Sequence, residues 1–207
     1  EGRKRFLSPA EIGRLGEALK AAERGEVRVE KEARGKGEGS PVPWQAIAAI
    51  RLLIFTGARK GEILTLGWDQ VDLEAGRLTL PTSKTGFKTI TLNAPARAVL
   101  ANLPRMEGNP YVIPGGKPGA HLVNIKDGWG AIRSAAGLED VHLHDLRHSF
   151  AAMGAGGGES LHLLGGLLGH RQSQTTMRYA HLADDPLSAA SERIGAQIAA
   201  HLEGGDG

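Results

Sequence analysis

His144-Asp145-Leu146-Arg147-His148-Ser149-Phe150 is the stretch on which the assignment of the fold depends most. On a helix, His144 and Arg147 lie three residues apart and share a face. An imidazole beside a guanidinium can hold a phosphate. His144 and His148 could instead bind zinc, although no Glu occupies the position that metalloproteases use. His148 could also simply pack or cap.

A second motif places an arginine just after a break between two helices. Residues 56–62 read Thr-Gly-Ala-Arg-Lys-Gly-Glu. Arg59 is predicted at the start of a short helix over about 58–66, where its guanidinium can join free backbone N–H groups at an anion. Glu62, about one turn further on, is placed to hold Arg59. The alternative is a helix cap with a surface ion pair.

Three further residues are candidates for chemistry. Lys84 lies at the tip of a predicted turn, where it could reach over a bound strand or simply be solvated. Gly169 ends a predicted helix and leaves His170 exposed at the break. Tyr179 follows nine residues later on the next predicted helix. A single tyrosine near a helix end most often lies in the core or on the surface.

The rest of the sequence predicts a mainly α fold with a small three-stranded antiparallel sheet (α+β). Helical spacing, caps and breaks predict helices over about 8–23, 43–56, 58–66, 95–103, 121–136, 144–155, 159–168, 173–181 and 186–201. Short alternating runs at 71–73, 77–80 and 89–92 predict a meander with two turns. Residues from about 25 to 41 are charged and aperiodic, which predicts a mobile loop.

Composition excludes several classes of protein. The 207 residues include no cysteine, which rules out disulfides and thiolate metal sites. No run approaches the roughly 18 apolar residues of a membrane span, and no signal region follows the N-terminus. We therefore expect a cytoplasmic protein. Residues 1–60 hold 13 Lys or Arg against 8 Asp or Glu, an excess of +5, whereas the remainder balances to −3. This excess favours phosphate contacts, or else a solvated basic helix and loop.

Taken together, the motifs resemble the tyrosine recombinase (phage integrase) family over nearly the whole chain. The matching pieces occur in one order, namely Thr56 to Glu62, Lys84, His144 to His148, Leu167 to His170, and Tyr179. Each piece is weak alone, but all of them in order are highly specific. The resemblance implies that Tyr179 is the nucleophile. It also implies that the basic catalytic residues are Arg59, Lys84, His144, Arg147 and His170.

The chemistry that this resemblance implies is DNA cleavage and rejoining. Guanidinium and imidazole groups can stabilise the charge on the phosphate oxygens without a metal. Clustered cations favour the phenolate of Tyr179, whose ordinary pKa is about 10. Lys84 can protonate the departing 5′ oxygen. The resulting 3′-phosphotyrosyl bond keeps the energy of the phosphodiester, so no cofactor and no ATP is expected.

The resemblance also sets expectations for partners and domains. It implies double-stranded DNA, a homo-oligomer on DNA such as a tetrameric synapse, and accessory DNA-bending or directionality proteins, with no membrane. We expect a catalytic domain over residues 1–185, and the separate helical DNA-binding domain that usually precedes it is absent from this chain. Residues 186–207 carry an apolar stripe predicted to dock on a neighbouring protomer, or alternatively to pack on the same domain. Competing functions are a type IB topoisomerase-like enzyme and a catalytically silent DNA-binding protein of the same fold.

Overall fold

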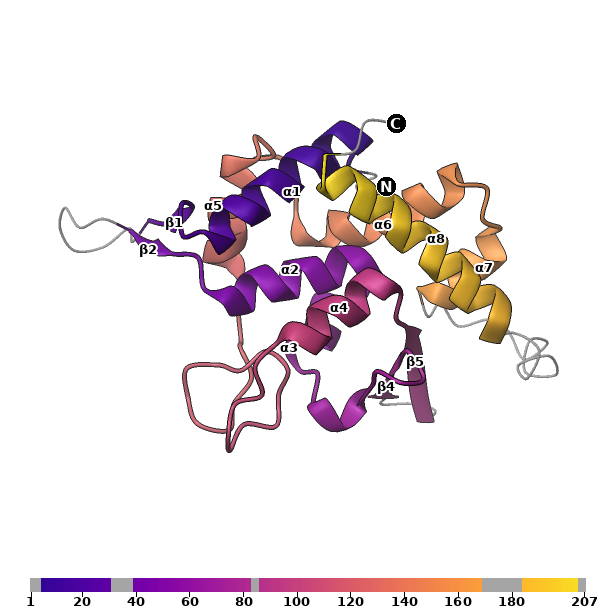
Figure 1. Ribbon diagram of the computed structural model, residues 1–207, viewed down its shortest axis with the longest axis horizontal. Helices are drawn as coiled ribbons and strands as arrows, with labels where there is room; N and C mark the ends of the chain where they lie inside the picture. The colour runs from indigo at the N-terminus through magenta and orange to yellow at the C-terminus, as the bar shows by residue number, and fades with distance from the viewer. Residues whose placement is uncertain (1–4, 31–38, 83–85, 169–183, 205–207) are drawn as a thin grey trace.

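The computed structural model describes residues 5–30, 39–82, 86–168 and 184–204, and within them it has the expected mainly helical fold (Figure 1). The helices are α1 (Pro9–Glu23), α2 (Trp44–Thr56), α3 (Lys60–Leu64), α4 (Ala94–Asn102), α5 (Lys126–Ala135), α6 (Leu143–Gly156), α7 (Leu161–Leu167) and α8 (Asp184–Leu202), with the 3₁₀ turn η1 (Trp68–Gln70). None of the described helices combines the length and the apolarity that a membrane span requires.

Helix α2 forms the centre of the helical body. Ten of its thirteen residues are buried, as expected for a helix surrounded by other elements rather than lying on a surface. It packs against α1, α4, α5, α6 and α8. The helix ends at Gly57, whose positive φ of 62° is a left-handed conformation that favours glycine. A Cβ at this position would also lie 2.8 Å from the ring of Phe150.

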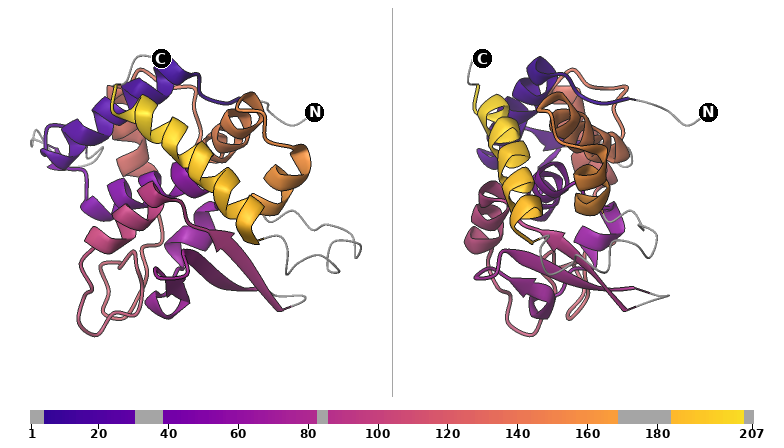
Figure 2. Two further views of the ribbon diagram at one scale, coloured as in Figure 1. Left: turned by 45° about the vertical axis from the view of Figure 1, so that its right-hand side comes forward. Right: turned by 90° about the vertical axis from the view of Figure 1, so that its right-hand side faces the viewer.

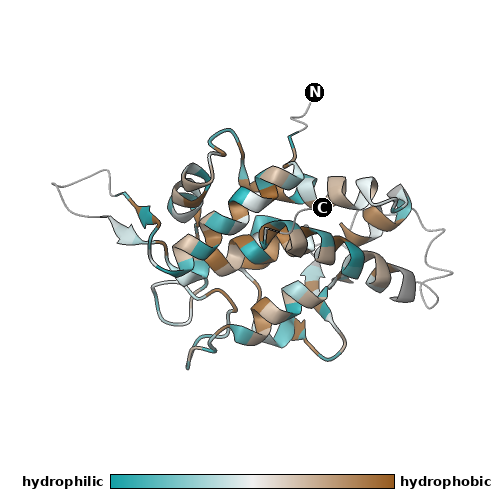
Figure 3. Cartoon of the chain, turned by 45° about the horizontal axis from the view of Figure 1, so that its top comes forward, coloured by the Kyte–Doolittle hydropathy of each residue, from teal (hydrophilic) through white to brown (hydrophobic). Residues whose placement is uncertain are grey.

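The predicted meander is confirmed among the described residues. Strands β3 (Val71–Asp72), β4 (Arg77–Thr82) and β5 (Gly86–Thr91) form an antiparallel sheet in sequence order. The β4–β5 ladder runs from the pair Arg77↔Thr91 to the pair Thr82↔Gly86. Figure 2 shows this hairpin projecting away from the helices. Figure 3 shows hydrophobic and hydrophilic segments alternating along the helices, as amphipathic packing requires.

Two local expectations differ from the structure. The charged segment begins and ends in a two-stranded sheet, because β1 (Arg28–Val29) pairs with β2 (Ser40–Pro41). The helix predicted over 121–136 begins only at Lys126. The preceding residues instead form an isolated bridge between His121 and Pro114, and the Asn124 side chain accepts a hydrogen bond from the Lys126 backbone N–H at 2.9 Å.

The C-terminal helix packs within its own chain. Ala190, Ile194 and Ile198 of its apolar stripe are all buried, and α8 contacts α1, α2, α4, α6 and α7. Figure 1 shows α8 (yellow) crossing this face of the helical body. In the described residues the stripe is thus buried within its own chain, as the intramolecular alternative expects. Docking of the segment on a neighbouring protomer stays a prediction.

Candidate active site

The structure brings Arg59, His144 and Arg147 together near Gly57, which ends α2. Arg59 precedes the first residue of α3, whereas His144 and Arg147 lie in the first turns of α6. The Arg147 guanidinium donates to the backbone carbonyl of Gly57, two residues before Arg59. The predicted residues Lys84, His170 and Tyr179 lie outside the described residues.

Arg147 is a buried cation held by backbone carbonyls. The residue is only 6% exposed, and its second hydrogen bond runs from Nη2 to the carbonyl of Leu168 at 2.7 Å. These two bonds use two of the five N–H donors of a guanidinium, so the group can still bind an anion while it is held in place. Burial and the charge of Arg59 lower the pKa of Arg147. Such a charge is costly to bury unless an anion compensates it.

Arg59 is tied to Glu62, as the sequence predicted. The Arg59 backbone N–H donates to Glu62 Oε2 at 2.8 Å, and Arg59 Nη1 donates to Oε1 at 3.2 Å. The Arg59 side chain nevertheless remains 55% exposed. Because the carboxylate holds one edge of the guanidinium, the remainder can face a ligand. Arg59 is thus the accessible arginine of the pair, and Arg147 the buried one.

His144 stacks edge-on against His148. Their ring centroids are 4.8 Å apart, and the ring planes are almost perpendicular at 89°. Partial burial lowers the pKa of His144, and the neighbouring His148 and Arg147 lower it further. A neutral imidazole can donate a hydrogen bond from one nitrogen. In the part of the chain that the structure describes, no group of three or more His, Cys, Asp or Glu side chains could hold a metal ion, so the zinc alternative gains no ligand set.

Lys88 is a residue of the site that the sequence did not single out. Its Nζ lies 2.7 Å from Glu62 Oε1, and only 12% of the Lys88 side chain is exposed. The signal that could have found it is strand alternation, because Lys88 and the buried Ile90 share one face of β5. The predicted strand began at Thr89 and therefore omitted Lys88.

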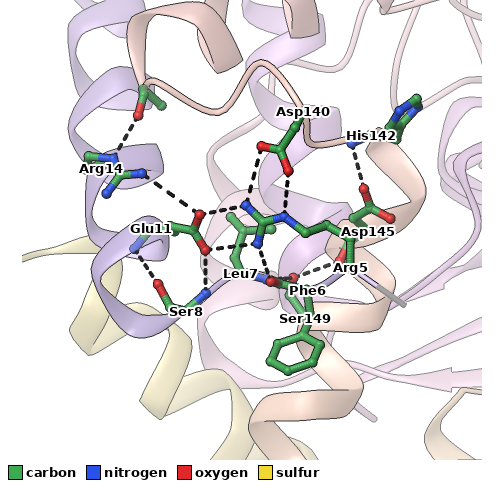
Figure 4. Close-up of polar contacts among 11 residues, drawn as sticks. Arg5, Phe6, Leu7, Ser8, Glu11, Arg14, Asp140, His142, Asp145 and Ser149 are labelled. Atoms are coloured by element: carbon green, nitrogen blue, oxygen red, sulfur yellow. Dashed lines mark hydrogen bonds and ion pairs between the residues drawn. The ribbon is translucent and has the colours of Figure 1, made fainter. Parts of the chain in front are cut away.

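A network of polar contacts fixes the start of α6, as Figure 4 shows. The Arg5 guanidinium bridges Glu11 at 2.6 Å and Asp140 at 2.8 Å. The Leu7 backbone N–H donates to Ser149 Oγ at 2.9 Å, within α6 itself. The segment before α1 and the loop before α6 therefore support the helix that carries His144 and Arg147.

The site opens into a cleft of about 1630 Å³. His144 and Arg147 line one part of it, and α5 and the β1 segment line the rest. Four further cations contribute to the lining, namely Arg28, Lys60, Lys126 and Arg133. The volume exceeds the roughly 300–1,000 Å³ of small-molecule pockets. The lining also holds the carboxylates of Glu26, Glu30 and Asp127, and Arg59 is not part of it. Arg147 and His144 therefore connect the arginine pair to the cleft, whose size suits an extended ligand.

Sequence comparison identifies relatives with named activities. A tyrosine recombinase XerC from Erythrobacter litoralis (strain HTCC2594) is 32% identical over 163 residues, which cover 75% of this chain and 52% of the relative. A shufflon-specific DNA recombinase from Escherichia coli is 31% identical over 138 residues, covering 64% of this chain and 34% of the relative. The matched region thus spans between a third and about half of these relatives.

Solved structures share the fold. A XerA recombinase has a TM-score of 0.62 with 22% sequence identity, over 91% of this chain and 64% of the other. A XerH recombinase bound to its difH substrate has a TM-score of 0.61 with 22% identity, over 88% and 52%. The model of the phage integrase family matches residues 34–185, well over half of the sequence. With its helical fold and its paired arginines, the chain belongs to the phage integrase family.

Proposed function

We propose that this chain is the catalytic domain of a site-specific DNA recombinase or integrase. The observation that carries the proposal is Arg147, a buried guanidinium beside the accessible Arg59, held by two backbone carbonyls at the edge of a large cleft. A phosphodiester supplies the anion that compensates both charges. A relative named a DNA recombinase, and the structure of a transposon integrase in complex with circular intermediate DNA, support the same ligand class.

In the proposed reaction Tyr179 releases its hydroxyl proton to water, because the clustered cations favour the phenolate. The phenolate oxygen attacks the scissile phosphorus, and the bond from phosphorus to the 5′ oxygen breaks. Arg59 and Arg147 stabilise the charge that develops on the non-bridging oxygens, and His144 and His170 donate hydrogen bonds to them. Lys84 gives a proton to the departing 5′ oxygen. Attack by a 5′ hydroxyl reverses these steps and rejoins the strand. Neither a metal nor ATP takes part in this scheme.

The proposal extends to assembly. Recombination needs two DNA sites cut in one complex, so we propose a homo-oligomer on double-stranded DNA, such as a tetrameric synapse, aided by DNA-bending or directionality proteins. The nucleoid is its proposed place of action. A topoisomerase-like enzyme would instead relax supercoiled DNA without sequence preference, and a silent DNA-binding protein would form no covalent adduct.

Covalent capture tests the nucleophile. The wild-type chain is incubated at low ionic strength, where phosphate contacts are strongest, with a pool of nicked duplexes of randomised sequence. Denaturing electrophoresis then separates protein–DNA adducts. We expect adducts from the wild type and none from Tyr179→Phe, because phenylalanine has no oxygen to attack phosphorus. Sequencing the captured DNA also reports any preferred site.

The chain offers a matched control. Tyr111 is the other of its two tyrosines, and its ring contacts His121, with centroids 5.2 Å apart. Tyr111→Phe should form adducts at the wild-type level. Adducts that persist in Tyr179→Phe would show that another residue is the nucleophile, and a wild type without adducts would favour the silent DNA-binding protein.

A further inference from the structure

Lys88 is the outermost described side chain that attaches the β4–β5 hairpin to the helical body. Along the ladder from its inner end, Leu78 and Ile90 form a buried pair, and Leu80 and Lys88 form the second pair beyond it. The next pair contains Phe87, which is 76% exposed. The ion pair between Lys88 and Glu62 therefore joins the hairpin to α3 at the point where its apolar contacts end.

Glu62 is the shared partner of the hairpin and the accessible arginine. Its Oε1 accepts from Lys88 Nζ at 2.7 Å and from Arg59 Nη1 at 3.2 Å, and its Oε2 accepts from the Arg59 backbone N–H at 2.8 Å. The Glu62 side chain is only 18% exposed, and its contact with Lys88 is partly buried, whereas its contacts with Arg59 are exposed. A movement of Lys88 would change how Glu62 holds Arg59.

The surroundings of Lys88 make this placement unfavourable for an ordinary structural lysine. Burial lowers the pKa of Lys88, and the charges of Arg147 and Arg59 lower it further, whereas Glu62 raises it. A lysine that served only solubility would extend into water. The ion pair with Glu62 at 2.7 Å instead holds the ammonium against this repulsion, and so fixes the position of the hairpin relative to α3.

We propose that Lys88 is a positioning residue that aims the β4–β5 hairpin, through Glu62, at the phosphate held by Arg59 and Arg147. Lys84 is joined to this hairpin by the chain itself, four residues before Lys88. Loss of the Lys88 ion pair would therefore impair proton transfer to the leaving group more than phosphate binding. This inference rests on the proposed function, in which Lys84 is the general acid.

The test compares two leaving groups in single-turnover cleavage. One substrate carries the ordinary 5′ oxygen, and the other a 5′ bridging sulfur, which departs as a thiolate with little need for a proton. General acid–base catalysis contributes typically about 10²–10⁴-fold. We expect Lys88→Met to lose about 10²-fold on the oxygen substrate and to regain most of that loss on the sulfur substrate. Lys88→Arg, which keeps the charge, should lose less.

Two variants complete the design. The double variant Lys84→Ala/Lys88→Met should cleave either substrate as fast as Lys84→Ala does, because both substitutions remove the same function, protonation of the leaving group. Arg77→Met is the matched control. It removes an exposed cation of the same hairpin, one that pairs with Asp72 at 3.6 Å. Arg77→Met should cleave both substrates at the wild-type rate. Should Lys88→Met fail to fold, Lys88→Gln keeps a donor for Glu62 and should show the same selective recovery.

The outcomes separate this inference from the proposed function. An equal loss by folded Lys88→Met on both substrates would show that Lys88 does not act through leaving-group protonation, and the inference would be wrong. A wild type that forms no adduct would overturn the proposed function, and this inference with it. If Lys84→Ala is not faster on the sulfur substrate while Tyr179 still forms adducts, Lys84 is not the general acid and this inference is wrong. The assignment of Tyr179 as the nucleophile is then unaffected.

Discussion

Arg59 and Arg147 are proposed to bind the same phosphate, but Arg147 is buried and Arg59 is exposed. Each should lose at least about 10²–10³-fold in cleavage when changed to alanine, the usual cost of removing a preorganised charge. Arg147→Ala should also destabilise the fold, because it leaves the carbonyls of Gly57 and Leu168 unpaired at about 1–3 kcal/mol for each buried group. Arg59→Ala should not, since its side chain is half exposed. Single-turnover rates and urea unfolding measure the two effects, and equal stability of both variants would contradict this account.

At this scale, the sequence predicts residues that belong to a local motif. The pairing of Arg59 with Glu62 depends on three residues of spacing and is confirmed. Lys88 meets Glu62 across 26 residues. This contact depends on the register of the β4–β5 hairpin and on its position over α3. The spacing of residues within one element predicts neither of these.

Helix α6 is supported from outside by the segment that precedes α1. Arg5 holds the pKa of Glu11 at about 2, well below its ordinary 4.5, chiefly through their hydrogen bond. Because the folded pKa is the lower one, this contribution to stability is present above about pH 4.5 and is lost as the pH falls toward 2. Arg5→Met should lower the free energy of unfolding by about 1–3 kcal/mol at pH 7. The difference from the wild type should shrink steadily below pH 4.5 in urea titrations, and a constant difference down to pH 3 would contradict this role.

Elements with many residues were predicted better than short ones. Helix α1 has a capping box, helix α2 follows Pro43 and stops at Gly57, and both begin and end close to the predicted residues. Strands β1 and β2 contain two residues each, too few to show an alternation. The start of α5 depends on a bridge between His121 and Pro114. The spacing of residues along one segment cannot predict a contact with another segment.

The whole molecule depends on α8, although the sequence left open whether this helix packs on its own domain. Ile194 is 1% exposed and contacts the region of Gly154 in α6. Ile194→Ala should therefore lower the free energy of unfolding by about 2–5 kcal/mol. Ser188→Ala, on the exposed side of the same helix, should change it by less than about 0.5 kcal/mol. Urea unfolding of the full chain measures both, and a neutral Ile194→Ala would show that α8 is not part of the stable core.

The contact between α1 and α8 has a consequence for folding during synthesis. A Cβ at Gly16 would lie 2.0 Å from the backbone oxygen of Leu202, so α1 and α8 meet backbone to backbone across 186 residues of sequence. Closing a loop of that length costs about 5 kcal/mol of chain entropy. On the ribosome, α1 emerges long before α8 has been synthesised, so the apolar face of α1 initially lacks this partner. During synthesis the apolar face of α1 therefore stays exposed, and prone to aggregation, until α8 has been made.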